Sequence, residues 1–152
     1  GMLSGAQAGF TYGAGGVWLW RNNWNCCSIA NDTGYVNNWR DDIHLPGAFD
    51  VSFGREIVEN LGIYYLDPVD LPMENPNDEM VASASPDRSK VVIYLPFSYP
   101  LKLRLNLEEY DVKAIDLETR NVLRPTLTKT EYGTLVGQLR YNHDYLIILR
   151  RE

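Results

Sequence analysis

The chain has 152 residues, of which 45% are hydrophobic, so it can bury one ordinary core and at most a small second module. Its formal net charge is −6, which argues against nucleic acid and anionic membrane surfaces as partners, because both are held mainly by Lys and Arg. The sequence also lacks the run of about 18 apolar residues that a membrane-spanning helix needs.

The first region begins with "AGFTYGAGGVWLW", residues 8–20, which is rich in glycine and aromatic residues. Residues 8–12 are predicted to form a strand, and residues 13–45 a long loop that contains the chain's four tryptophans. The glycines lack the spacing and the basic residue of a phosphate-binding loop, so we interpret them as a turn where two backbones approach closely.

The composition of this loop is typical of a carbohydrate-binding rim. Aromatic residues alternate with Asn, Asp and Arg, which supplies flat faces for sugar C–H groups and polar groups for hydroxyls. We therefore predict Tyr12, Trp18 and Trp20 as stacking platforms, and Asn22 or Asp32 as hydroxyl partners. The alternative interpretation is that these tryptophans only fill a core.

An amphipathic helix is predicted over residues 46–61. Its apolar positions recur every four residues, at Phe49, Phe53, Ile57 and Leu61, and Val58 lies on the same face. Pro46 suits the first turn of a helix, and Gly62 suits the position just past its end. The expected partner of the apolar stripe is the strand predicted at residues 8–12.

Residues 67–79 contain three prolines and five acidic residues without periodicity, which predicts a linker. The spacing of the acids does not match a calcium-binding loop. From residue 80 onward, short apolar runs such as "LKLRLNL" alternate with period two and are separated by turns such as "PDRS", "ETRN" and "YNHD". The predicted fold class is therefore mainly β, with an antiparallel β-sandwich at residues 80–152 that follows a strand, an aromatic loop and one helix at residues 3–66.

No catalytic or metal site is predicted. Cys26 and Cys27 are adjacent, so a disulfide between them would be strained, and zinc spacing is absent. Glycoside hydrolysis needs two carboxyls about 5–10 Å apart in a cleft. The adjacent Asp41 and Asp42 would diverge on a helix, and their position ahead of "IHLPGAF" predicts an N-cap role for the helix that follows. No nucleophile signature accompanies His44. We expect no catalytic residue, no cofactor and no metal in this chain.

Two stretches of the chain resemble known proteins. "GFTYGAGGVWLW" and "LPGAFDVSFGREIVENLGIYYLDP" are similar to the final strand, loop and helix of the (β/α)8 barrel in bacterial glycoside hydrolases of the apiosidase-like kind. "MVASASPDRSKVVIYLPFSYPLKLRLNLEEYDVKAIDLETRNV" resembles the β-domain that follows this barrel, which is described as a collagen-binding domain of a collagenase. Neither a basic groove nor an aromatic ladder argues for a collagen ligand.

The resemblance implies a plant or bacterial polysaccharide as the partner and a periplasmic or extracellular location, although no signal peptide is recognisable. The family places its catalytic carboxyls on earlier barrel strands, so that pair has no counterpart here. Its glycine-rich turn usually presents a histidine to the sugar, whereas Ala14 or Gly15 stands at this position.

Two functional hypotheses remain open from the sequence. In the first, the chain is the non-catalytic C-terminal portion of a glycoside-hydrolase-like protein. Its exposed strand edges then favour either homo-oligomers or an N-terminal part that folds back onto the sandwich. In the second, it is a free-standing, non-enzymatic carbohydrate-binding or accessory protein. The second hypothesis expects a monomer in which residues 8–12 join the β-sheet.

Overall fold

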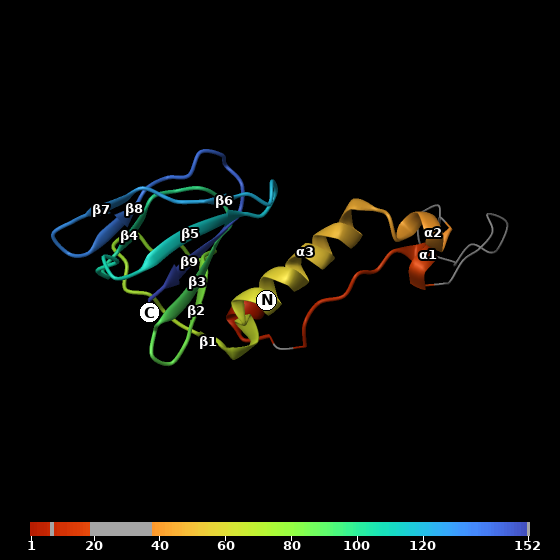
Figure 1. The fold of residues 1–152 in the computed structure, drawn as a ribbon, viewed down its shortest axis with the longest axis horizontal. Coiled ribbons are helices and arrows are strands. Elements are labelled where there is room, and N and C mark those ends of the chain that lie inside the picture. The colour runs from red at the N-terminus through yellow and green to blue at the C-terminus, as the bar shows by residue number, and fades with distance from the viewer. Residues whose placement is uncertain (7, 19–37, 152) are drawn as a thin grey trace. The chain divides into compact units, whose positions relative to one another are not determined.

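A computed structural model describes residues 1–6, 8–18 and 38–151 (Figure 1). The chain divides into two compact units. One, here called the helical unit, is Ala8–Leu61. The other, called the β unit, joins Gly1–Gln7 to Gly62–Glu152. Among the described residues, none of the helices has both the length and the apolar character needed to cross a bilayer.

The β unit contains two antiparallel sheets. The larger sheet has six strands in the spatial order β1 (Asp67–Pro68), β2 (Val81–Ala84), β3 (Lys90–Leu95), β9 (Tyr145–Arg150), β5 (Asp111–Asp116) and β6 (Val122–Leu123). The smaller sheet has three strands in the order β4 (Leu101–Leu103), β8 (Thr134–Val136) and β7 (Leu127–Lys129). This arrangement confirms the predicted class, a mainly β fold with an antiparallel sandwich and one long helix.

The core lies between the two sheets and follows the alternation of the strands. In β3, Val91, Ile93 and Leu95 are buried on the core face. Their cross-strand partners in β9 are Leu149, Ile147 and Tyr145, which are also in the core because paired residues share a face. The smaller sheet closes this core with Leu101, Leu103 and Val136. Strand β9 is buried at five successive positions, as expected for a central strand covered on both faces.

The segment predicted as a linker, residues 67–79, makes backbone contacts with both sheets. At its start, β1 pairs with β2, and the Val69 amide donates to the Ala82 carbonyl. Further on, the Arg104 amide donates to the Pro72 carbonyl, and Met73 forms an isolated bridge with Leu103 of β4. The segment therefore passes from the edge of the larger sheet to the edge of the smaller one.

Two short 3-10 turns belong to the β unit, η1 (Met2–Ser4) and η2 (Ile63–Tyr65), and they contact each other. Leu3 and Ile63 are buried in them. Ser83, itself buried in β2, donates from its hydroxyl to the Leu3 carbonyl over 2.7 Å. The chain on both sides of the helical unit is therefore anchored within the β unit.

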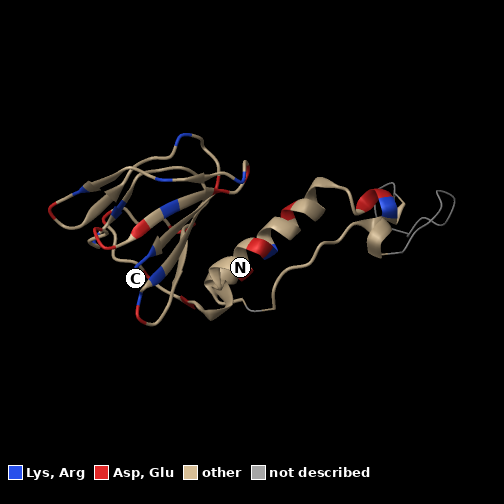
Figure 2. Cartoon of the chain, viewed as in Figure 1, with Lys and Arg blue, Asp and Glu red and all other residues tan. Residues whose placement is uncertain are grey.

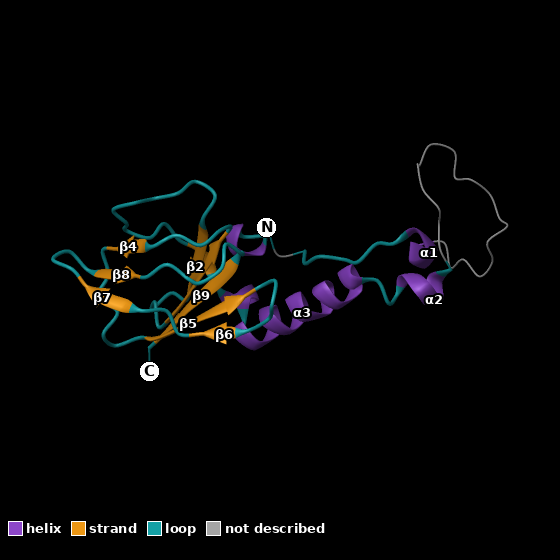
Figure 3. Cartoon of the chain, turned by 90° about the horizontal axis from the view of Figure 1, so that it is seen from above, coloured by secondary structure: helices purple, strands orange, loops and turns teal. Residues whose placement is uncertain are grey.

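The helical unit contains α1 (Gly15–Trp18), α2 (Trp39–Asp42) and α3 (Pro46–Leu61), as Figure 3 shows in purple. Helix α3 has the predicted bounds, and Gly62 follows it in the left-handed conformation, with φ of 61°. Ile57, Val58 and Leu61 are buried, whereas Phe49 of the same predicted stripe is 50% exposed.

The strand predicted at residues 8–12 is not formed, and residues 9–14 have no regular secondary structure. A strand needs the backbone of a neighbouring strand, and neither sheet of the β unit includes this segment. Its aromatic side chains instead approach two glycines of α3. A Cβ atom at Gly54 would lie 3.0 Å from Phe10 Cζ, and one at Gly47 would lie 3.2 Å from Tyr12 Cε2.

Charged residues of both signs are interspersed over the β unit (Figure 2). Arg124 and Lys113 both pair with Asp111, at 2.6 and 3.0 Å, and Lys129 pairs with Glu108 at 2.7 Å. These side chains are exposed, so each pair contributes little to stability.

Candidate functional site

Two of the five predicted carbohydrate-binding residues lie in the described part of the chain, Tyr12 and Trp18. The other three, Trp20, Asn22 and Asp32, lie outside the described residues. The complete five-residue site therefore stays a prediction. The structure gives the geometry of Tyr12 and Trp18 alone.

Trp18 presents its side chain to solvent at the end of α1. It is 72% exposed, and the Trp18 amide donates to the Ala14 carbonyl to close the single helical turn. The indole lies over the backbone of Gly13, because a Cβ atom there would be only 3.1 Å from Trp18 Cε2. Gly13 thus leaves room for the ring. An exposed indole supported from below is a geometry that can stack on a sugar.

Asp42 fixes the arrangement of this turn. Asp42 is only 2% exposed, and its carboxylate Oδ2 accepts a hydrogen bond from the Gly16 amide over 2.6 Å. The Tyr12 hydroxyl donates to the Asp42 carbonyl oxygen over 2.8 Å. Asp42 therefore joins α1, α2 and Tyr12, so its carboxylate serves the fold of the turn.

Asp41 and Asp42 do not take the predicted N-cap position ahead of the long helix, because they lie within a separate short helix, α2. Asn38 caps α2 by accepting from the Arg40 amide over 2.9 Å, and both aspartates lie in its first turn. Carboxylates at this end of a helix are favoured by the exposed amides.

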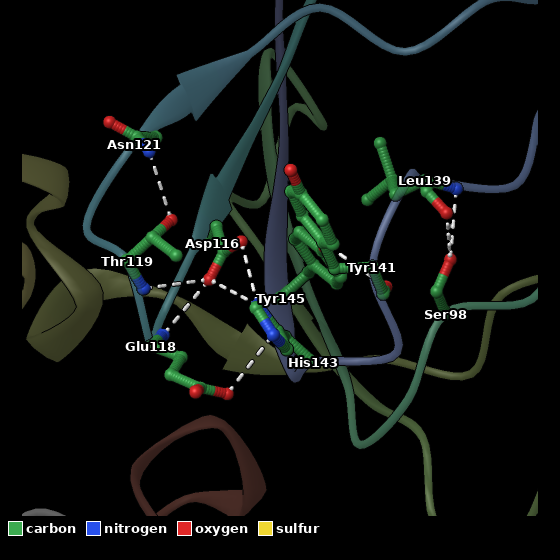
Figure 4. A network of polar contacts seen from close by, with 9 residues as sticks. All are labelled: Ser98, Asp116, Glu118, Thr119, Asn121, Leu139, Tyr141, His143 and Tyr145. Carbon is green, nitrogen blue, oxygen red and sulfur yellow. Dashed lines mark hydrogen bonds and ion pairs between the residues drawn. The ribbon is translucent and has the colours of Figure 1, made fainter.

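The β unit contains a second polar cluster, which sequence reasoning missed (Figure 4). Asp116, at the end of β5, is 1% exposed. Its Oδ1 accepts from the amides of Glu118 and Thr119, at 3.0 and 2.9 Å. Its Oδ2 lies 2.9 Å from Nδ1 of His143. The turn "ETRN" was visible in the sequence, but nothing local connects Asp116 to a histidine 27 positions later.

His143 contacts a carboxylate through each ring nitrogen. Its Nε2 lies 3.2 Å from Glu118 Oε2, in addition to the contact of Nδ1 with Asp116. The ring also stacks on Tyr141, with centroids 5.3 Å apart and planes 18° apart. Tyr145 lies in a similar orientation with its centroid at 6.4 Å.

These contacts shift the pKa of both partners in opposite directions. The hydrogen bond to Asp116 raises the pKa of His143 above its usual 6.5, against the opposing effect of desolvation. Burial alone would raise the pKa of Asp116, but hydrogen bonds from Thr119 and His143 outweigh it and lower this pKa below 3.8. Both groups are therefore stabilised in their charged forms.

The Asp116–His143 pair has the composition of a general base with its orienting carboxylate, but the geometry argues for a structural role. A general base needs a free ring nitrogen within hydrogen-bond reach of the reacting proton. Here Nε2 faces Glu118. The nearby Ser98 hydroxyl, shown in Figure 4, exchanges two hydrogen bonds of 2.9 Å with the backbone of Leu139. In the described ranges, His, Cys, Asp and Glu form no group of three or more that could hold a metal ion.

A groove of about 660 Å³ runs along the β unit between η1, residues 68–78 and the start of β2. Its lining is apolar at Leu71, Met73 and Met80 and acidic at Asp70 and Asp78. It contains no aromatic side chain, so it offers no stacking platform for a sugar.

Comparison with known families identifies one relationship. Residues 1–64 match the family model described as the apiosidase-like catalytic domain. This match relates the first part of the chain to glycoside hydrolases of the apiosidase-like kind, in agreement with the resemblance noted in the sequence. It includes the whole helical unit and η1. A search of curated proteins finds no match.

Proposed function

We propose that this chain is the non-catalytic C-terminal portion of a glycoside-hydrolase-like protein, in which the β unit is an accessory domain in carbohydrate degradation. One observation carries the proposal. Residues 1–64 match a catalytic-domain family, yet the described part of the helical unit consists of three helices and connecting chain, with no strand. In a (β/α)8 barrel, catalytic side chains project from the ends of several different strands.

The positions of Asp41 and Asp42 do not suit a catalytic pair formed by these two acids. Asp42 is engaged with the Gly16 amide, and Asp41 is adjacent to it in α2. Two carboxyls that act on a glycosidic bond must face each other across the substrate. We therefore propose that residues 8–61 correspond to the last unit of a barrel whose catalytic carboxyls are supplied by strands other than those described here.

The anchoring of η1 and η2 supports an accessory role for the β unit. Both turns lie at the ends of the family-matched region, and both are built into the β unit through Leu3, Ile63 and the hydrogen bond from Ser83. A β-domain that holds both ends of such a segment would brace it against fraying.

We further propose a plant or bacterial polysaccharide as the ligand, with Trp18 as the stacking platform. The support is the exposed indole over Gly13, together with the polar composition of the adjoining sequence. The periplasmic or extracellular location and the formation of homo-oligomers through strand edges belong to the same proposal.

The alternative, a free-standing carbohydrate-binding protein, predicts a different structure for residues 8–12. It expects residues 8–12 to join the β-sheet of a monomer. Residues 8–14 contribute no strand to either sheet, which favours the first proposal.

Intrinsic fluorescence titrations with plant and bacterial oligosaccharides test the proposal, because all four tryptophans lie between residues 18 and 39. We expect a saturable change with one glycan class, lost in Trp18→Ala and kept in Tyr132→Ala. Tyr132 is a suitable control because it is an exposed aromatic residue of the β unit. Hydrolysis of any of these glycans by the chain would overturn the non-catalytic assignment. A response that survives Trp18→Ala would remove Trp18 from the site.

A further inference from the structure

The cluster around His143 joins two segments that are distant in sequence. Asp116, Glu118 and Thr119 belong to the turn between β5 and β6, whereas Tyr141 and His143 precede β9 (Figure 4). Asp116 lies at the floor of the cluster and is fully engaged by the amides of its own turn and by His143. Glu118 lies at its outer edge, with a side chain that is 68% exposed.

The two contacts of His143 depend differently on its proton. A protonated imidazole donates from both ring nitrogens, so it can bind Asp116 through Nδ1 and Glu118 through Nε2 at the same time. A neutral imidazole has one N–H and one lone pair. Because the buried Asp116 carboxylate needs a donor more than the exposed Glu118 does, the remaining proton stays on Nδ1. The lone pair of Nε2 then faces a carboxylate, and this contact becomes repulsive.

We propose that His143 is a proton-operated clamp that ties the residues before β9 to the β5–β6 turn and releases Glu118 when the ring loses its proton. The Asp116 arm persists through the change as a hydrogen bond from the neutral ring. Loss of the proton therefore breaks only the contact between Nε2 and Glu118, at the surface of the β unit. The contact between Nδ1 and the buried Asp116 remains.

The charges around the ring favour the closed form. Asp116 and Glu118 approach from the β5–β6 turn, and Asp144 adds a third carboxylate from the chain next to His143. The Tyr94 hydroxyl of β3 donates to Asp144 over 3.3 Å, and the Arg140 guanidinium lies over the Tyr141 ring rather than on the histidine. On its flat sides the ring meets Tyr141 and Tyr145, whose π-faces attract a cation.

The direction of the pH effect follows from the shifted groups. The pKa of His143 is raised in the folded chain, so the stabilisation from the clamp is complete below 6.5 and is lost as pH rises through the folded value. The pKa of Asp116 is lowered, so its contribution is present above 3.8 and is lost as pH falls through its folded value. The clamp is therefore closed in weak acid and opens on the alkaline side.

A titration of the His143 ring by NMR tests the clamp. The chain has two histidines, so His44→Gln leaves a single ring signal, and His44 is exposed and outside the cluster. We expect a midpoint above that of a histidine in a reference peptide. Above this midpoint, ring ¹⁵N shifts should show a proton on Nδ1, and the side-chain signals of Glu118 should shift as its contact with Nε2 is lost. The amides of Glu118 and Thr119 should keep their protection from hydrogen exchange, because they donate to Asp116, which stays bound.

Glu118→Gln supplies the matched variant, because an exposed amide of the same shape keeps the fold intact. The introduced amide can accept from the protonated ring and donate to the neutral one, so the turn should no longer respond to pH, and the midpoint of His143 should fall. The proposal is overturned if the midpoint lies at or below that of the peptide, if the neutral ring carries its proton on Nε2, or if Glu118→Gln leaves the midpoint unchanged.

Discussion

The ring of Phe10 lies directly against Gly54, so closely that a Cβ atom at that position would come within 3.0 Å of Phe10 Cζ. Tyr12 meets Gly47 in the same way, seven residues and about two helical turns earlier. Because the later residue of the segment meets the earlier glycine, residues 9–14 run antiparallel to α3. The two glycines lie on one face of the helix and leave space there for the two rings.

This relationship predicts opposite responses at the two glycines. Within a helix, alanine is favoured over glycine by roughly 1 kcal/mol. The Phe10 ring has a free end and can shift away from a new methyl group, so Gly54→Ala should stabilise α3. The Tyr12 ring is held by its hydrogen bond to the Asp42 carbonyl, so Gly47→Ala should break this bond or be strained, and should destabilise α3.

Hydrogen exchange of the α3 amides, compared at one pH, measures both variants locally. Ser52→Ala is a control within the same helix, because the exposed Ser52 hydroxyl bonds to its own helix at the Ala48 carbonyl. Loss of protection in Gly54→Ala, with none in Gly47→Ala, would contradict the packing described here.

Gly133 should tolerate no side chain. It lies in the turn between β7 and β8, where its φ is 159° and its backbone passes close to β4. A Cβ atom there would clash with the Leu103 carbonyl oxygen and lie 2.7 Å from the Leu105 amide nitrogen. Since both are backbone atoms that cannot rotate away, Gly133→Ala should lower the free energy of unfolding by several times RT, about 2 kcal/mol or more.

Gly137→Ala is the matched control for this substitution. A Cβ atom there would lie 3.3 Å from the Thr126 carbonyl oxygen, so only a small adjustment is needed. Urea unfolding, monitored by circular dichroism, should show a large decrease in the free energy of unfolding for Gly133→Ala and a small decrease for Gly137→Ala. Equal losses would mean that the β7–β8 turn can move away from β4.

Removal of the Tyr145 hydroxyl should lower the free energy of unfolding by a modest, measurable amount. Tyr145 is fully buried and its hydroxyl donates to the Tyr141 carbonyl over 3.1 Å. Burial, followed by the nearby Asp116 charge, raises the pKa of this phenol, so it remains a donor at any ordinary pH. Tyr145→Phe leaves the carbonyl without this donor and should lower the free energy of unfolding by about 0.5–1.5 kcal/mol.

Tyr132→Phe provides the comparison, because Tyr132 is exposed and water replaces its hydrogen bonds. The same urea titration should place this variant within about 0.5 kcal/mol of the parent chain. A Tyr145→Phe variant as stable as Tyr132→Phe would show that the Tyr141 carbonyl finds another donor.

Asp87 should contribute to the loss of stability in acid. Hydrogen bonds from the Ser85 hydroxyl, and then from the amide and hydroxyl of Ser89, lower its pKa to about 2. Because the folded pKa lies below the usual 3.8, the stabilisation is complete above 3.8 and is lost as pH falls toward about 2.

Asp87→Asn tests this contribution, since the amide oxygen can still accept these hydrogen bonds but carries no titrating charge. The slope of unfolding free energy against pH, measured between pH 4 and about 2, should be smaller in the variant than in the parent chain. An unchanged slope would assign the acid sensitivity to other carboxyls, of which Asp116 is the first candidate.

Local patterns in the sequence determined most of the secondary structure. Alternation with period two placed Val112 and Ala114 on the core face of β5, and Leu101 and Leu103 on the core face of β4. The repeat of four residues and the residues at both ends placed α3 at Pro46–Leu61. These predictions succeeded because periodicity reports which side of an element faces apolar surroundings, and that is a local property.

The sequence was less informative about the candidate sites. It singled out Trp18 and Tyr12 by composition, but it did not show that Gly13 makes room for the indole or that Asp42 holds the phenol. It predicted a strand at residues 8–12 because a run of suitable residues says nothing about whether a partner strand is present. It also gave no sign that residues 67–79 would bond to both sheets.

Tertiary structure alone decided which polar groups meet. Asp116 and His143 are 27 residues apart, and in the sequence Asp116 is simply the end of a strand and His143 part of a turn. They meet because β5 and β9 are neighbours in the larger sheet, with Asp116 opposite Tyr145, which places the residues just before β9 beside the β5–β6 turn. Strand order depends on the packing of the whole core, and this information is spread over the entire chain rather than written near either residue.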